Sequence, residues 1–373
     1  MPAKITITDE DTARISEKIN VFLERDLSAV LIKAQENAAP HILSSLKKRW
    51  PAERRKQAKE MADFRRRLRE RWGGAISKLQ MLVTMARDLG GDINKSSRSE
   101  PGPAGMTLVD VITRLHARAC QVAAEVVTLL ESGFANGAMA RWRTMHEISV
   151  TAAFISTHGS GCAQRYKEHQ IIESYKAAQE YEQIRVRRGY DAIPEEEFNN
   201  IRKRYDRVIS QHGRSFASQY GWVAKDLKLK KPTFKDIEES VGIDHFRGHY
   251  RMASHGIHAN PKGIFFSMTS LFPTDMLLAG PSNAGLADAG HSTALSLTTI
   301  SATLALLASN FDHQVALRAM NLLTEEIGTT FLRAHKKLYR DEIRFRVAES
   351  DFEAVGGLEG ESKEDNTDVS KQE

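Results

Sequence analysis

The sequence predicts an all-α protein with a helical-bundle core. Apolar residues recur at the three- and four-residue spacing of helices along most of the 373 residues. No segment shows the convincing apolar–polar alternation of a strand. With 41% hydrophobic and 27% charged residues, the chain is neither disordered throughout nor of low complexity. A chain of this length can bury enough surface to fold without disulfides or a structural metal.

The first segment, 1–88, is predicted to be a basic helical region. Its apolar spacing indicates helices over 8–36, 51–72 and 74–89, and Pro51 suits a first helical position because its missing N–H is not needed there. Residues 89–105 read LGGDINKSSRSEPGPAG, which predicts a linker.

The second segment, 106–348, is predicted to be an all-helical core domain. Gly133 suits the left-handed position that closes the first of its helices. The stretch 294–308 is apolar but short and rich in Ser and Thr, which favours a buried helix over a membrane span. The predicted helices lie at 107–131, 134–157, 163–188, 194–212, 244–259, 286–310 and 313–347, with a looser region at 213–242.

The opening residues carry acids and no apolar core, so no secretory signal is expected. These features together predict a soluble, cytoplasmic protein with no membrane partner.

Charge is distributed unevenly along the chain. Residues 47–72 hold twelve Lys or Arg against four acids, a net of +8, whereas 349–373 hold nine acids against two lysines, a net of −7. The acidic segment is predicted to be a disordered, solvated tail. The basic helix has two readings: it binds the phosphates of RNA or another nucleic acid, or it meets the acidic tail or the acids of a partner subunit. The arginines nominated for nucleic-acid binding are Arg54, Arg55, Arg65, Arg66, Arg67, Arg69 and Arg71.

The helix predicted at 134–157 carries the first candidate cluster. Arg143 and Glu147 stand four residues apart and share one face, and His146 lies on the same flank. Much of the helix is apolar, and charges there are costly unless paired. The plainer alternative is an exposed intrahelical ion pair of small energetic value.

The stretch DHFRGHYRMASHGIHANPKG, 244–263, carries the second cluster. Its last turn should favour a protonated histidine, because the helix dipole is negative there. Such a histidine beside an arginine and hydroxyl groups could bind an anion or transfer a proton. The alternative is a structural role, in which these residues form a polar helix end at the surface whose hydrogen-bonding groups all have partners. The candidate residues are Tyr250, Arg251, Ser254, His255 and His258.

Several other chemistries are excluded or unsupported. Only Cys120 and Cys162 supply sulfur, so a disulfide framework and a four-cysteine zinc site are excluded. The His245–His249 pair has the spacing of a zinc protease, but Phe246 stands where the general-base Glu is needed. No Gly-rich phosphate loop and no Gly-x-Ser-x-Gly elbow occur. We therefore expect no metal and no cofactor.

Two short spacings resemble those of HEPN-type helical nucleases, which carry Arg and His with four to six residues between them on a late helix. Arg251 and His258 are separated by six residues, and Arg141 and His146 by four. In such enzymes a histidine moves protons while an arginine stabilises the phosphorane charge. Met252 departs from the polar residue that often follows the arginine.

A second resemblance covers about residues 106–315. The stretch LLESGFANGAMARWRTMHEISVTAAFI and the Tyr250–Ser254–His258 spacing before Pro261 are similar to an uncharacterised bacterial helical family, a domain of unknown function (DUF5677). By this resemblance Arg143, Glu147, Ser254 and His258 form a shared polar site, although His146 departs from the expected apolar residue.

These observations predict one of two functions. The first is a metal-independent ribonuclease of a stress or phage-defence system, with His258 as the proton-transfer group. The second is a non-enzymatic helical scaffold or regulatory protein, with a structural polar network, whose basic helix binds nucleic acid or an acidic partner. A homo-oligomer is compatible with either function. An open site would favour catalysis, and a sealed, mutually bonded network would favour a structural role.

Overall fold

The structure is a computed structural model that describes residues 9–99, 106–258, 260–265, 271–272, 277–307 and 310–360. Every regular element in these ranges is a helix, which confirms the all-α prediction. The chain divides into two compact units, residues 1–66 and 67–373.

Helix α1 (Asp9–Ser99) is continuous where the sequence predicted three separate helices. It passes over both Pro40 and Pro51, so the prediction of a helix start at Pro51 was wrong. Each proline removes one backbone hydrogen bond, but its neighbours are mostly Ala, Leu, Lys, Arg and Glu, which favour helix.

The part of α1 in the second unit buries one apolar stripe. Its members recur every three or four residues, as expected of a helix packed on one side. The stripe also explains why the linker predicted at 89–105 is helical over 89–99: burial of Leu89 and Ile93 outweighs the helix-weakening effect of Gly90 and Gly91. The stripe comprises Leu68, Trp72, Ala75, Leu79, Leu82, Ala86, Leu89 and Ile93.

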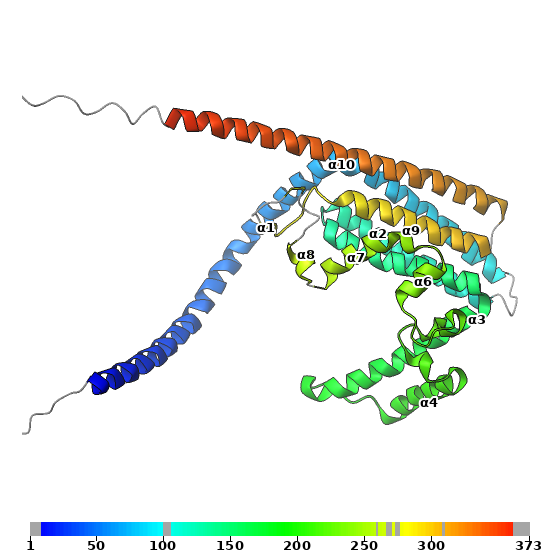
Figure 1. Ribbon diagram of the computed structural model, residues 1–373, viewed down its shortest axis with the longest axis horizontal. Helices are drawn as coiled ribbons and strands as arrows, with labels where there is room; N and C mark the ends of the chain where they lie inside the picture. Colours follow the sequence, from blue (N-terminus) through cyan, green and yellow to red (C-terminus); the bar gives the residue numbers. More distant parts are fainter. Residues whose placement is uncertain are drawn as a thin grey trace, which may run out of the picture. The chain divides into compact units, whose positions relative to one another are not determined.

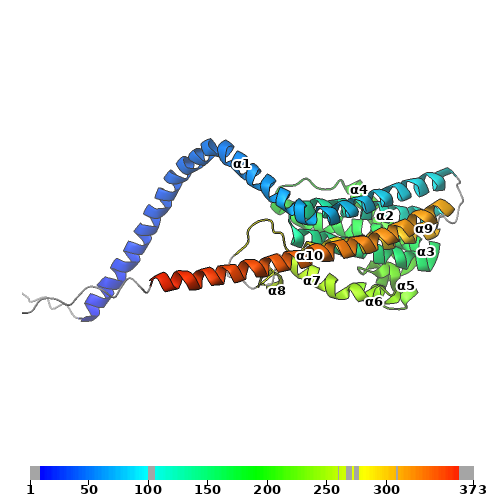
Figure 2. The same cartoon turned by 90° about the horizontal axis from the view of Figure 1, so that it is seen from above.

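The core of the second unit is a bundle. Helices α2 (Met106–Glu131) and α3 (Ala135–Arg188) pack on one another, and α9 (Leu286–Leu307) packs on both of them. Helix α10 (Phe311–Gly360) lies along α9 in both views (Figures 1 and 2). The α9 helix is buried along most of its length, as predicted for 294–308.

Helix α3 contains the two helices predicted at 134–157 and 163–188. Gly159 separates them, with a non-helical backbone at φ 74° and ψ −164°. Before α3, Gly133 has φ 76°, as predicted for a helix-closing glycine. The second half of α3 packs on α4 (Glu195–His212), where Tyr175 stacks on Tyr205 with ring centroids 4.3 Å apart.

Short helices cover the segment between α4 and α9. Helix α7 ends at Ile257, two residues before the predicted end at 259. Helix α6 begins with a capping box at Thr233 and Asp236. The bounds are η1 Arg214–Ala217, η2 Gly221–Val223, α5 Ala224–Leu227, α6 Phe234–Ser240, η3 Asp244–Phe246, α7 Arg247–Ile257 and α8 Pro261–Phe265.

The predicted acidic tail begins inside α10, because residues 349–360 continue that helix, and residues 361–373 lie outside the described ranges. In the described part of the chain, no helix combines the length and apolar character that crossing a bilayer requires.

Candidate functional site

Tyr250 of α7 joins the two charged residues predicted on α3. Arg143 Nη2 donates to the Tyr250 hydroxyl at 2.9 Å, and that hydroxyl donates to Glu147 Oε1 at 2.6 Å. Arg143 Nη2 also lies 3.1 Å from Glu147 Oε1, one helical turn away. The hydroxyl thus closes a triangle of charge-assisted bonds between two helices. The buried Arg143 Nε has no hydrogen-bond partner among the described residues.

A second, fully buried pair lies beside this triangle. His146 Nε2 is 2.8 Å from Glu238 Oε1, and both side chains have no exposed surface. Arg247 of α7 forms an ion pair with the other carboxylate oxygen of Glu238. Glu238 comes from α6, so this group joins α3, α6 and α7.

Aromatic rings lie against both groups, although the Arg143 and Glu147 side chains remain 24% and 37% exposed. The Arg143 guanidinium lies 4.8 Å and that of Arg247 5.6 Å from the centroid of the Tyr250 ring, within the range of cation–π attraction. Phe234 lies 5.2 Å from the Tyr250 ring and 6.0 Å from the His146 ring. The rings exclude water from the buried side and strengthen the polar bonds there.

Burial and bonding shift the pKa values in this network. Burial lowers the pKa of His146, and the hydrogen bond to Glu238 offsets only part of that effect. Burial, together with the bond to Glu147, raises the pKa of Tyr250. Burial opposes the charged form of Arg143, but the Tyr250 hydroxyl and the Glu147 charge outweigh it, so its pKa is raised. At neutral pH these shifts favour a neutral His146, a neutral Tyr250 and a charged Arg143.

The structure brings together only part of the predicted site. Arg143, Glu147 and Tyr250 meet, but the Ser254 hydroxyl donates to the Tyr250 carbonyl oxygen at 2.8 Å, within its own helix. His258 is an exposed residue that follows α7, and its backbone N–H donates to the Ser254 carbonyl oxygen at 3.3 Å. Arg251 is exposed and His255 half-buried. The prediction that His258 acts in one site with Arg143 therefore has no contact to support it.

Sequence reasoning missed Glu238 and Arg247. The available signal was an acid on the apolar face of a short amphipathic helix: Glu238 lies four residues after Phe234 and next to Ile237, all three buried. His146 was noticed beside Arg143 and Glu147, in the spacing from Arg141, and as a departure from the family pattern. Its partner could not be named, because 92 residues separate the two in the chain.

The nominated arginines lie on α1 and divide between the two units. Arg54, Arg55, Arg65 and Arg66 fall in the first unit, and all are exposed. In the second, Arg67 and Arg69 are exposed, whereas Arg71 Nη1 is 2.8 Å from Asp341 Oδ2 of α10. Arg71 is thus better explained as a packing residue of the bundle.

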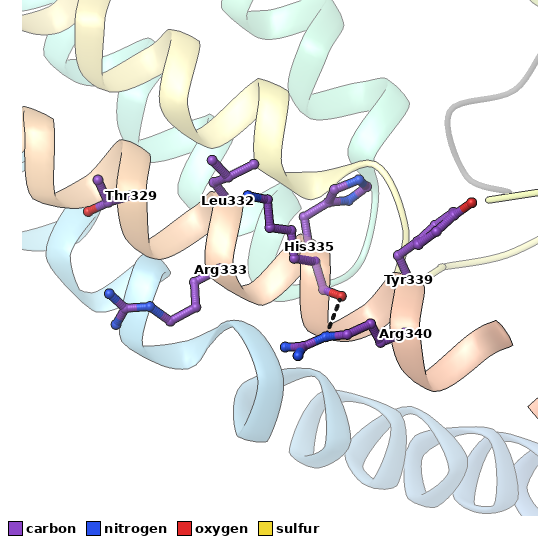
Figure 3. A pocket seen from close by; sticks show the side chains of 7 residues that line it. Thr329, Leu332, Arg333, His335, Tyr339 and Arg340 are labelled. Carbon is purple, nitrogen blue, oxygen red and sulfur yellow. Dashed lines mark hydrogen bonds between the residues drawn. The ribbon is translucent and has the colours of Figure 1, made fainter. Parts of the chain in front are cut away.

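A separate groove of about 720 Å³ lies on α10 (Figure 3). Although its described lining is basic, it comes from this one helix, and Arg340 Nε donates to the Lys336 carbonyl oxygen at 3.3 Å. No second described element adds a functional group to it. The lining residues are Thr329, Leu332, Arg333, His335, Lys336, Tyr339 and Arg340.

The described ranges contain neither a cluster of metal ligands nor an exposed cysteine. No three His, Cys, Asp or Glu side chains gather there as metal ligands would. Both cysteines are buried and free. Burial raises the pKa of Cys120 to about 11 and that of Cys162 to about 12, so neither presents a thiolate nucleophile at neutral pH.

Comparison with protein families identifies the part of the chain that holds this network. Residues 109–271 match a family of unknown function, DUF5677. We call this segment the DUF5677 region because it is similar to that family. The whole network, from Arg143 to Tyr250, lies in the DUF5677 region, whereas α1, α9 and α10 lie outside it. No curated protein and no solved structure matches the chain, and the comparisons add no support for the HEPN resemblance.

Proposed function

We propose that this protein is a non-enzymatic helical protein that binds the phosphate backbone of nucleic acid through the basic part of α1. One observation carries the proposal: every Lys and Arg from residue 47 to residue 59 is exposed on that helix. Exposed cations along a helix attract phosphates without reading base sequence.

The surrounding acids leave most of this charge available. Lys56 lies 3.9 Å from Glu60 and Arg66 3.7 Å from Asp63, and all four side chains are largely exposed. Exposed ion pairs of this kind contribute little energy, so a phosphate can compete for the cations.

The polar network supports the non-enzymatic part of the proposal. Arg143, Tyr250 and Glu147 bond to one another, and Glu238 bonds to both His146 and Arg247. An arginine that stabilises a phosphorane and a histidine that moves protons need to face a substrate. Here these groups hold α3, α6 and α7 together, so the network is better suited to fixing helix packing than to catalysis.

The binding test uses a fluorescein-labelled 20-nucleotide RNA and a labelled 20-base-pair DNA duplex, followed by anisotropy over a range of salt concentrations. We expect Arg54→Glu/Arg55→Glu to weaken binding to both probes by roughly tenfold or more at low salt, because two phosphate contacts become repulsive. The matched control is Arg187→Glu/Arg188→Glu, an equal charge change on exposed arginines at the end of α3. Equal loss of binding in both variants, or no binding by the native protein, would overturn the proposal.

The catalytic alternative is tested on the same RNA in EDTA. We expect no cleavage by the native protein. Cleavage that disappears in folded His258→Ala or Arg143→Ala protein would instead establish a metal-independent ribonuclease.

A further inference from the structure

The helix of the first unit exposes many large apolar side chains. Between 51% and 64% of the surface of each is accessible to solvent, whereas Leu68 and Trp72 further along α1 are at most 1% exposed. They are Ile19, Val21, Leu27, Val30, Leu31, Ile32, Ile42, Leu43, Leu46 and Trp50.

Such a helix needs a partner. Helix propensity alone gives little stability in water, and most helical stability in proteins comes from packing an apolar face. A run of exposed apolar residues this large marks an interaction surface. The identity of the partner can be read from the order of the apolar residues and the charges.

Eight apolar positions of this helix are symmetric about a point between residues 34 and 35. Outside this set, Val21, Ile32 and Leu43 mirror the polar or charged residues at positions 48, 37 and 26. Ile19 and Trp50 are equally distant from this point, as are Leu27 and Ile42, and Leu31 and Ala38. Position 23, also a leucine, mirrors Leu46. Successive members of the set are four or seven residues apart, hence one or two helical turns, which keeps neighbours close to one face.

We propose that two copies of this chain pair through residues 9–60 of α1, antiparallel, with residue i of one copy opposite residue 69 − i of the other. Ile19 then lies opposite Trp50, and Leu27 opposite Ile42, of the second copy. Each of the eight symmetric positions meets an apolar position, and Leu31 meets the small Ala38 near the two-fold axis. A second copy satisfies the pattern because a two-fold interface must be complementary to itself.

The charges select the antiparallel direction. Residues 9–26 hold six acids and three bases, a net of −3, whereas 43–60 hold seven bases and two acids, a net of +5. The 27–42 segment between them has one Lys and one Glu and is neutral. Antiparallel pairing sets the acidic end of one copy beside the basic end of the other, while parallel pairing would place two segments of +5 side by side.

The first test measures the mass of the full chain by light scattering and sedimentation over a range of concentrations. We expect the native chain to be a dimer. In Leu27→Glu/Ile42→Glu we expect the dissociation constant of the dimer to rise by on the order of a hundredfold or more, because carboxylates would be buried among apolar groups. The control, Val186→Glu/Leu229→Glu, changes two exposed apolar residues of the second unit and should remain a dimer. A native monomer, or a Leu27→Glu/Ile42→Glu variant that dimerises as tightly as the native chain, would overturn the proposal.

The second test fixes direction and register without destabilising the helix. Leu31→Cys and Ala38→Cys chains are oxidised under mild conditions, separately and mixed. Antiparallel pairing predicts a crosslinked dimer only in the mixture, since position 31 faces position 38. Crosslinking of each variant alone would indicate parallel pairing and contradict the proposal. Native Cys120 and Cys162 are buried and should not react.

This inference does not depend on nucleic-acid binding. Loss of dimer in Leu27→Glu/Ile42→Glu and loss of binding in Arg54→Glu/Arg55→Glu are separate measurements, so either proposal can fail alone.

Discussion

The Tyr250 hydroxyl of α7 bonds to both Arg143 and Glu147 of α3. Because the Tyr250 side chain is only 8% exposed, removing its hydroxyl leaves Arg143 and Glu147 with one bond fewer on the buried side. We expect Tyr250→Phe to lower the free energy of unfolding by about 1–2 kcal/mol, since the bonds are charge-assisted but partly replaceable by water.

Urea unfolding of Tyr250→Phe checks this expectation, with Tyr190→Phe as the control. Tyr190 is exposed after α3, and loss of its hydroxyl should have little effect. Unchanged stability of Tyr250→Phe would mean that the triangle does not hold α7 in place.

His116 is a buried histidine outside the candidate site whose titration should appear in stability. Burial lowers its pKa from 6.5 to about 4, and its Nε2 lies 3.0 Å from the Ser301 hydroxyl of α9. The unfolded chain therefore binds a proton at higher pH than the folded chain does. The free energy of unfolding is unaffected by His116 titration above pH 6.5, and it falls by about 3 kcal/mol as the pH drops from 6.5 to 4.

His116→Gln should flatten that pH dependence, because the amide retains a bond to Ser301 and does not titrate. The comparison is urea unfolding of native and variant protein between pH 4.5 and 7.5. His146, His169 and His291 also have lowered pKa values through burial, so the variant should retain part of the acid sensitivity. Identical slopes in the two proteins would exclude His116 as a contributor.

The sequence could predict Arg143 and Glu147 because a four-residue spacing is visible in one helix. It could predict neither Glu238 nor Arg247, since a buried ion pair across helices depends on tertiary contacts. The position of Pro261 indicated a helix end near His258, but not that this end would be exposed, and the role of His258 stays a prediction.

At the scale of helices, local spacing predicted α2 and α4 within one residue of each predicted end. It failed where burial outweighs local preference. The glycines at 90 and 91 suggested a linker, yet Gly90 is needed inside α1 because a Cβ there would lie 2.6 Å from His116 Nδ1. The merging of three predicted helices into α1 has a different origin: residues 27–60 are exposed, and helix-favouring neighbours carry α1 past both prolines.

Two glycines of the second unit should respond oppositely to alanine. Gly159 breaks α3 at φ 74° and ψ −164°, a conformation nearly restricted to glycine, and Gly74 lies inside helical α1. Neither has a neighbour within 4 Å of an added Cβ, so only the backbone decides the outcome.

We expect Gly159→Ala to destabilise the fold by about 1–3 kcal/mol through backbone strain. Gly74→Ala should stabilise it by about 0.5–1 kcal/mol, because alanine loses less backbone freedom in a helix. Thermal and urea unfolding of the two variants provide the comparison. A stabilising Gly159→Ala would mean that α3 can run straight through this point.

At the scale of the whole molecule, a net charge of +5 combines a basic stretch in α1 with an acidic chain end. Because the proposed binding to nucleic acid is electrostatic, the total charge should influence it even where the acids make no specific contact. Replacing the five acids of 361–373 by Gln and Asn raises the net charge to +10. We expect tighter binding of the RNA probe by several-fold at low salt.

The salt dependence of this gain separates two effects of the acids in 361–373: a long-range electrostatic effect on RNA binding, and direct contact with the basic part of α1. The Debye length falls from about 30 Å at 0.01 M salt to about 8 Å at 0.15 M, so a general field effect should fade over this range. A gain that persists at 0.15 M salt would instead indicate that the acids contact the basic segment directly, in competition with phosphate. No gain at any salt concentration would mean that the acids of this segment have no influence on binding, and that the affinity depends on the α1 cations alone.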